Sequence, residues 1–210
     1  MEKVAGNLIS GEKTVWEAGS GQAPLARLMI ARINADFVDY SRQRKASRQL
    51  LTGLLVDTFG GPDGSWHICG DPSGAPYVMD AGGEISVSLS HSGHWVAAGI
   101  ARGALVGADI EQARFGRDTG KLAAYLGWNL EKGDDAGFYK RWTLWEALVK
   151  SRGGVIRGPG PDSILGEREG VLHGFCEQPV KGVFCALVLQ TPALSSITWK
   201  RLSPAALRAW

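Results

Sequence analysis

The chain has 210 residues, of which 44% are hydrophobic and 21% are charged, and its formal net charge at pH 7 is +2. This composition is typical of a folded globular protein and excludes a disordered chain. The small net charge argues strongly neither for acidic partners nor for nucleic acid, and we expect no nucleic-acid ligand. The three cysteines are too widely spaced for a disulfide framework or a zinc site.

Hydropathy gives no sign of secretion or of membrane insertion. Residues 1 to 10 contain no apolar stretch of the kind that a signal peptide needs. The longest apolar run, Val183 to Leu189, is far too short to span a bilayer. We therefore expect a cytoplasmic protein with no membrane partner.

The N-terminal part of the chain predicts one short strand and two helices. Residues Thr14 to Glu17 favour a strand, and Ala23 to Ile33 favour a helix with Pro24 in its first turn. Residues 36 to 59 predict a long helix, because leucines recur at helical spacing in the second half and Gly60-Gly61 follows the end. The first half of this helix is basic, which fits either a solvated face or an anion site. The basic residues are Arg42, Arg44, Lys45 and Arg48.

The middle of the chain changes from loops to strands. Residues 60 to 83 are rich in Gly, Pro and Asp and predict loops, with a tight turn at Gly74-Ala75-Pro76 that leads into an extended segment. Residues 84 to 111 predict a three-stranded meander, because polar and apolar residues alternate and turn residues interrupt the pattern twice. The three strands cover Glu84 to Ser90, Trp95 to Ala101 and Leu105 to Glu111.

Two carboxylates end the last strand of this meander. Asp109 and Glu111 alternate with Ala108 and Ile110, so both carboxylates point to the same side of the strand. At this spacing they can share one hard cation such as Mg²⁺, which is usually held by one or two carboxylates together with water and substrate phosphates. The alternative is an acidic strand end that faces water.

The C-terminal part predicts further helices and then strands. Short helical pieces are expected around Leu122 to Leu126 and after Asn129, and a longer helix over residues 136 to 151 with Asp134 or Asp135 as its cap. Residues 152 to 170 predict a loop rich in Gly and Pro that lacks the G-K-[ST] ending of a phosphate-binding loop. Strands are expected at Val171 to Phe175, Val183 to Leu189 and Ile197 to Leu202.

The helix over residues 136 to 151 has two stripes. Its apolar stripe consists of Phe138, Trp142, Trp145 and Val149. An adjacent stripe holds Thr143, Glu146 and Lys150. Glu146 and Lys150 are four residues apart and are expected to form at least an ordinary ion pair.

Two long helices, each accompanied by a group of strands, predict an α+β fold of two similar halves. We place the halves at residues 1–104 and 105–210 and expect them to form one intimate globular unit. No convincing internal repeat is present in the sequence.

Three segments that hold polar and charged residues stand in a definite order. They are Ser88-Leu89-Ser90-His91-Ser92, then Gly107-Ala108-Asp109-Ile110-Glu111, and last Trp142 to Lys150, which reads WTLWEALVK. Together they resemble the 4′-phosphopantetheinyl transferase superfamily, and more closely its longer, monomeric type, which activates peptide and polyketide synthetases. The marks of that family are a serine-histidine turn, a G-[IVA]-D-[IV]-E strand and a W-[ST]-x-K-E-[AS]-x-x-K helix. The resemblance covers residues 40 to 155 well, the tail loosely and residues 1 to 34 hardly at all.

The resemblance implies a fold and a reaction. It implies two similar halves in a pseudo-two-fold arrangement, each with a small, mostly antiparallel sheet and a long helix, and an active site at their junction. The reaction moves the phosphopantetheine arm of coenzyme A to a serine of an apo acyl or peptidyl carrier protein and releases 3′,5′-ADP. The implied cofactor is Mg²⁺, the implied partner is an acidic carrier protein, and the implied setting is secondary metabolite biosynthesis by a monomer.

The resemblance also implies roles for individual residues. Asp109, Glu111 and Glu146 would hold Mg²⁺. Glu146 would also be catalytic, since either its carboxylate or a metal-held water would take the serine proton, and Lys150 would reach the pyrophosphate. The remaining contacts to coenzyme A fall on the serine-histidine turn, the basic helix and the Gly74 turn. These residues are Ser90, His91, Arg48, Pro76 and, less directly, Arg44.

Three positions depart from the family pattern. Trp145 stands where the signature helix usually has lysine, and Ala75 stands where the turn usually reads G-K-P. A further glutamate, often proposed as the base in this type, aligns with Leu130, and Glu131 can replace it only if the local register shifts. These departures leave open a second hypothesis, in which the chain keeps the scaffold and binds carrier protein or coenzyme A without transferring the arm. A Mg²⁺-dependent hydrolase of a pyrophosphate similar to coenzyme A is a third.

Overall fold

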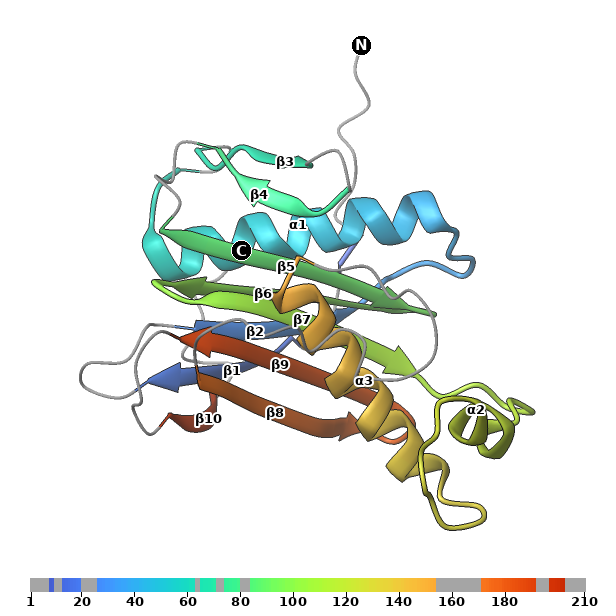
Figure 1. The fold of residues 1–210 in the computed structure, drawn as a ribbon. Helices are drawn as coiled ribbons and strands as arrows, with labels where there is room; N and C mark the ends of the chain where they lie inside the picture. Colours follow the sequence, from blue (N-terminus) through green and yellow to red (C-terminus); the bar gives the residue numbers. More distant parts are fainter. Residues whose placement is uncertain are drawn as a thin grey trace.

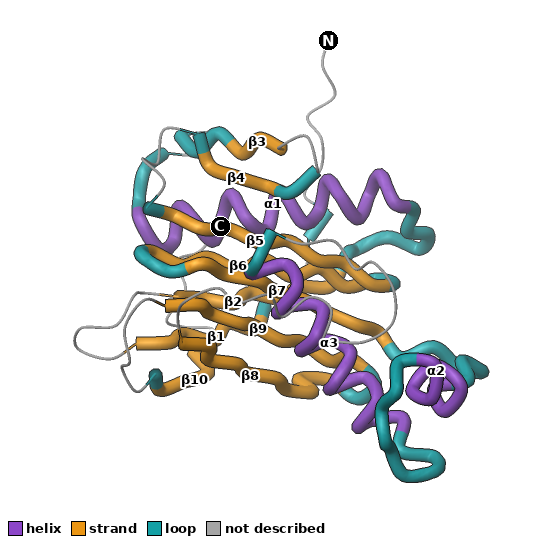
Figure 2. The backbone as a smooth tube through the Cα atoms, in the orientation of Figure 1, coloured by secondary structure: helices purple, strands orange, loops and turns teal. Residues whose placement is uncertain are grey.

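Antiparallel sheets and two long helices make up an α+β fold (Figures 1 and 2). The structure is a computed structural model, and it describes residues 8–9, 13–19, 26–62, 65–70, 74–79, 84–153, 171–191 and 197–202. The strands are β1 (Thr14–Gly19), β2 (Ala26–Arg32), β3 (Ile68–Gly70), β4 (Pro76–Val78), β5 (Ile85–Ser92), β6 (Trp95–Arg102), β7 (Leu105–Gln112), β8 (Val171–Val180), β9 (Val183–Thr191) and β10 (Thr198–Leu202). The helices are α1 (Tyr40–Phe59), α2 (Thr119–Tyr125) and α3 (Asp135–Ser151).

Helix α1 covers one face of a five-stranded sheet with the order β10-β1-β2-β6-β5. The predicted helix over residues 36 to 59 is confirmed from Tyr40 onward. It begins there because the Asp39 side chain caps it by accepting a hydrogen bond from the Arg42 amide at 2.7 Å. The buried face of α1 consists of Ala46, Ser47, Leu50, Leu51, Gly53, Leu54 and Leu55. In its basic first half, Arg42, Arg44 and Lys45 are exposed and Arg48 is half-buried.

The predicted helix over Ala23 to Ile33 is wrong, because residues Ala26–Arg32 form strand β2. The strand lies in the middle of the sheet between β1 and β6, so both of its faces are buried. A continuous apolar run fits a buried strand as well as a buried helix, and periodicity alone does not separate them. Arg27 is tolerated there because its guanidinium pairs with Glu17 at 2.7 Å and with Asp57 at 2.9 Å.

The predicted meander is correct for its first two strands and wrong for the third. β5 and β6 pair as a hairpin, whereas β7 pairs with β9 in a separate three-stranded sheet of order β7-β9-β8. β7 still lies beside β5 (Figure 1), and serine side chains of β5 form hydrogen bonds to β7. Ser86, Ser88 and Ser92 each accept a hydrogen bond from a backbone amide of β7, at 3.0, 2.9 and 3.1 Å. The two sheets are therefore joined by hydroxyl groups.

Helix α3 packs on the three-stranded sheet and crosses β7 and β9 (Figure 1). Asp134 caps it by accepting a hydrogen bond from the Gly137 amide at 2.8 Å, as the sequence predicts. A close approach to β7 is possible because Gly107 has no side chain. A Cβ atom there would lie 1.8 Å from the carbonyl oxygen of Ala147. The predicted helical piece after Asn129 is absent, and residues 128–134 are irregular apart from a turn at Lys132-Gly133.

The remaining strands belong either to the two larger sheets or to a separate two-stranded hairpin. β8 and β9 confirm the predicted tail strands, and β10 pairs with β1 of the first sheet. The predicted division at residue 104 falls in the turn between β6 and β7, and β10 crosses from the second part of the sequence to the first sheet. β3 and β4 form a small hairpin inside the region that was predicted as loops. Among the described residues, no helix combines the length and the hydropathy needed to cross a bilayer.

Candidate functional site

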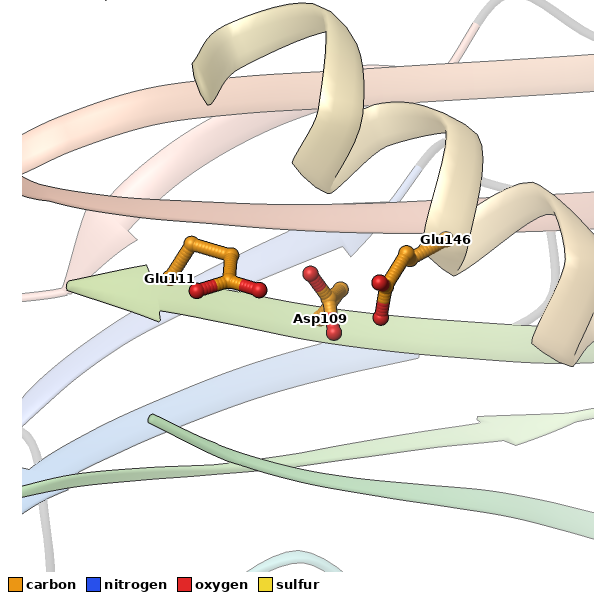
Figure 3. A group of neighbouring side chains, drawn as sticks. All are labelled: Asp109, Glu111 and Glu146. Atoms are coloured by element: carbon orange, nitrogen blue, oxygen red, sulfur yellow. The ribbon is translucent and has the colours of Figure 1, made fainter. Parts of the chain in front are cut away.

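Three carboxylates meet where α3 crosses β7. Asp109 and Glu111 project from β7, and Glu146 projects toward them from α3 (Figure 3). One carboxylate oxygen from each lies within 4.8 Å of the others, a spacing at which a single metal ion can be held. The alternation of β7 accounts for the first two, and the glycine contact at Gly107 brings the third close. The predicted acidic set is therefore assembled as one group.

Asp109 is the most buried member of the acidic group, with 1% of its surface exposed. Its Oδ1 atom accepts hydrogen bonds from Lys150 Nζ at 2.6 Å and from Ser90 Oγ at 2.7 Å. Its Oδ2 atom is buried and has no hydrogen-bond partner. Because a buried carboxylate oxygen without a partner is costly, this atom is a natural ligand position for a cation.

Glu111 is oriented by two neutral donors. Ser92 Oγ donates to its Oε2 at 2.8 Å, and the Trp142 indole Nε1 donates to its Oε1 at 3.2 Å. Burial raises the pKa of Glu111, and the negative charge of Asp109 raises it further. The carboxylate is thus held in place, although its charge is incompletely compensated by protein groups.

Glu146 has the most perturbed carboxyl of the group. Burial and then the charge of Asp109 raise its pKa from 4.5 to about 8. Lys150 compensates only partly, since its Nζ atom lies 3.9 Å from Glu146 but 2.6 Å from Asp109. The predicted ion pair between Glu146 and Lys150 is therefore present but secondary, and the main partner of Lys150 is Asp109.

The stripe of α3 that faces the site differs from the predicted one. Trp142, Glu146 and Lys150 follow one another at four-residue intervals, and all three contact the residues around Asp109 and Glu111. Trp142 was predicted only as a member of the apolar stripe. Its four-residue spacing from Glu146 nevertheless places the two side chains on the same face of the helix, next to the site. Thr143 was predicted on the site stripe, but it is buried and donates to the Tyr139 carbonyl at 2.6 Å.

A cleft of about 320 Å³ opens beside the acidic group. The predicted residues Arg44, Arg48, Pro76, Ser90, His91, Glu146 and Lys150 all line it. Gly74 and Leu89, which belong to the predicted turn and to the serine-histidine segment, also line it, and Tyr40 and Ser47 of α1 are lining residues that were not predicted. The cleft therefore brings together α1, the Gly74 turn, β5 and α3.

The cleft is rich in groups that bind phosphate. Lys150 Nζ donates to Ser90 Oγ at 3.0 Å, which links α3 to β5 on the wall of the cleft. Arg48 is anchored through a hydrogen bond of 3.0 Å from its Nη1 atom to the Ile68 carbonyl. Burial and then the charge of Lys150 lower the pKa of His91, so its imidazole is neutral at pH 7. Cationic and neutral donors thus converge on one cleft.

The three departures from the family pattern lie around this site. Trp145 is 5% exposed and packs against Trp128 and Trp142 in an aromatic cluster, away from solvent. Ala75 is exposed between the two cleft residues of its turn. Glu131 is exposed and does not belong to the acidic group, and Leu130 packs against the aromatic cluster.

Comparison of the chain with protein-family models and with curated proteins gives no match. A functional assignment therefore depends on the motifs and on the geometry of the site.

Proposed function

We propose that the protein is a Mg²⁺-dependent 4′-phosphopantetheinyl transferase that modifies an apo acyl or peptidyl carrier protein. The observation that supports this function is that one residue from each of the three motif segments takes part in a single hydrogen-bonded group. Ser90 of the first segment, Asp109 of the second and Lys150 of the third touch one another at 2.6 to 3.0 Å. A chance resemblance in three separate segments would not require them to meet.

The acidic group fits a hard divalent cation. Its donors are carboxylate oxygens, one of which is buried without a partner, and the pKa values of Glu111 and Glu146 are raised as expected for uncompensated charge. Mg²⁺ prefers such oxygen ligands and usually retains water and phosphate in its remaining positions. Asp109, Glu111 and Glu146 would hold the ion, which would supply charge neutralisation for the pyrophosphate of coenzyme A.

The reaction forms a bond between the carrier serine oxygen and the β-phosphorus, and the bond to the bridging oxygen breaks. Lys150, Ser90 and the neutral His91 line the cleft beside Glu146, where they would hold the pyrophosphate and the departing 3′,5′-ADP. Arg48 and Arg44 would bind the 3′-phosphate. The serine proton would go either to Glu146, which lines the cleft, or to a water held at the acidic group.

The proposed function carries further expectations for the whole protein. The packing of α1 on β5 and β6, and of α3 on β7 and β9, supports two similar halves in pseudo-two-fold arrangement with the site between them. We infer that the enzyme acts as a cytoplasmic monomer on an acidic carrier protein, in the biosynthesis of secondary metabolites. The division into halves at residue 104 is part of this proposal. Strand β10 crosses that division, because it pairs with β1 of the first sheet.

The test is the mass of a carrier protein after incubation. The purified protein, coenzyme A and Mg²⁺ are mixed with apo carrier proteins of the fatty-acid, polyketide and peptide classes. We expect at least one carrier to gain one phosphopantetheine group. Asp109→Asn should abolish the gain while the melting temperature stays near the wild-type value, and Asp118→Asn, at an exposed helix cap, is the matched control. No gain on any carrier would overturn the proposal.

Binding without transfer would instead support the second hypothesis. The position of Trp145 favours it, because the side chain at the usual lysine position lies in the aromatic cluster and adds no cation to the cleft. Calorimetry with coenzyme A and with each carrier separates the two functions, since a transfer-inactive protein binds one or both and leaves the carrier mass unchanged. Release of products from coenzyme A without any carrier would indicate the hydrolase.

A further inference from the structure

Tyr40 is an exposed aromatic residue on the wall of the cleft. It is the first residue of α1, and 65% of its surface is exposed. It lines the cleft together with Arg44, Ser47 and Arg48, which follow it on the same face of the helix. Most of that face is suited to phosphate, but a large exposed ring is not. A ring that is exposed on the wall of a cleft is available to pack against a flat ligand.

The ring of Tyr40 is held in position by its neighbours. The His91 ring meets it edge to face, with centroids 5.3 Å apart and an interplanar angle of 81°. The Arg44 guanidinium lies 5.8 Å from the centroid of the ring. An aromatic side chain fixed by two such contacts loses little freedom when a flat ligand packs against it.

The position of Tyr40 relative to the phosphate groups of the cleft matches one part of a nucleotide. His91 connects the two regions, because it contacts Tyr40 and directly follows Ser90, which accepts from Lys150. Arg44 and Arg48 follow Tyr40 on the same face of α1 and line the same cleft. A ligand whose phosphates sit at Lys150 can therefore place a base against Tyr40.

We propose that Tyr40 is the stacking platform for the purine base of the substrate nucleotide. The inference rests on the proposed function, in which that nucleotide is the adenosine half of coenzyme A. Stacking needs only the flat face of a base, so Tyr40 adds affinity for a purine without hydrogen bonds to its edge. The guanidinium of Arg44 lies over the Tyr40 ring at 5.8 Å from its centroid and supports the ring, while it stays available for the 3′-phosphate.

The test compares ligands with and without the base. Calorimetry in Mg²⁺ gives the Kd of coenzyme A, and competition against coenzyme A gives the Kd of 4′-phosphopantetheine, which has no base. Tyr40→Ala should weaken coenzyme A binding by roughly tenfold or more, which is the effect of losing one stacked base. It should leave phosphopantetheine binding within about twofold of wild type, and Tyr40→Phe should restore the affinity for coenzyme A because the ring remains.

Phe37→Ala is the matched control. Phe37 is an aromatic residue just before α1, it is 69% exposed, and it does not line the cleft, so its removal should change neither Kd. A Tyr40→Ala variant that binds coenzyme A as tightly as wild type overturns the stacking role while leaving the transferase proposal intact. Equal weakening of both ligands also overturns it, because a base platform cannot affect a ligand without a base. Failure of the wild-type protein to bind coenzyme A refutes the transferase itself.

Discussion

Glu146 must lose a proton before it can bind a cation, because its pKa of about 8 leaves it mostly protonated at pH 7. Metal binding then releases that proton, so the affinity for Mg²⁺ should rise with pH by up to about tenfold per unit below pH 8 and level off above it. Calorimetry at several pH values, in two buffers of different ionisation enthalpy, measures both the affinity and the proton released. A Kd that is independent of pH, with no proton released, would contradict the raised pKa.

The same shift determines how the stability of the metal-free protein depends on pH. The folded state holds the Glu146 proton more tightly than the unfolded chain does, so the stabilisation is complete below pH 4.5 and is lost as pH rises to about 8. Glu146→Gln should therefore flatten the fall in the free energy of unfolding across this range. Glu111, whose pKa is also raised, accounts for the part of the slope that remains. Urea denaturation at a series of pH values tests this, and an unchanged slope would contradict it.

At the level of single elements, α3 holds the acidic group in place in two ways. The indole of Trp142 donates a hydrogen bond to Glu111, and the ammonium group of Lys150 pairs with Asp109. Trp142→Phe keeps a ring in the aromatic cluster and removes the hydrogen bond from Nε1 to Glu111. Because hydrogen bonds to charged groups contribute about 1.5–3 kcal/mol, Mg²⁺ affinity and transfer should fall by roughly tenfold or more. Trp145→Phe is the matched control, since its buried Nε1 has no hydrogen-bond partner. Equal effects of the two variants would show that ring packing, and not the donor, matters.

The elements also show where sequence patterns predict structure and where they do not. α1 and α3 were predictable because their leucines and aromatic residues have helical period, and α3 also because its aspartate cap was recognised. β2 was mistaken for a helix because a strand buried on both faces has no alternation. β7 was recognised as a strand but given the wrong partner, since its pairing with β9 spans a long stretch of sequence and leaves no local signal.

The site was predicted in the same uneven way. Asp109, Glu111 and Glu146 were found because their motifs fix residue type and spacing, and the structure places them together. Trp142 and Tyr40 were missed as site residues because an aromatic residue on a helix is usually part of the core, and only the fold reveals which ring borders a cleft. The order of motifs along the chain thus indicated the members of the site but not their contacts.

At the level of the whole molecule, the serines of β5 join the two sheets and support the site in different ways. Ser88 is 5% exposed and accepts from the Ala108 amide at 2.9 Å, whereas Ser90 donates to Asp109. Ser88→Ala should cost about 1–3 kcal/mol in the free energy of unfolding, because a buried amide loses its partner. Its Mg²⁺ affinity should stay close to wild type, and Ser90→Ala should instead weaken Mg²⁺ binding. Urea denaturation and calorimetry on both variants check this, and a reversed pattern would contradict it.

Gly107 sets the distance between α3 and the sheet, and therefore the geometry of the whole site. Its Cβ in Gly107→Ala would lie 1.8 Å from the Ala147 carbonyl oxygen and 2.5 Å from the Ser151 amide nitrogen. Both atoms belong to the helix backbone, so α3 as a whole must move away, at a cost of roughly 3 kcal/mol. The shift carries Glu146 and Lys150 away from Asp109, and we expect Mg²⁺ affinity and transfer to fall with stability.

Gly174→Ala is the control for this substitution, because the exposed Gly174 of β8 lies near Leu144 of the same helix. There a Cβ would meet only the Cδ1 atom of Leu144 at 3.2 Å, and a half-exposed side chain can turn aside. Thermal denaturation should therefore show a clear loss for Gly107→Ala and little change for Gly174→Ala, with Mg²⁺ binding lost only in the first. A Gly107→Ala protein that melts and binds Mg²⁺ like wild type would mean that α3 does not contact β7 as described. The structure would then give no reason for a glycine at position 107. If stability and Mg²⁺ binding are lost only in Gly107→Ala, the glycine is explained, because it lets α3 come close enough to place Glu146 beside Asp109 and Glu111.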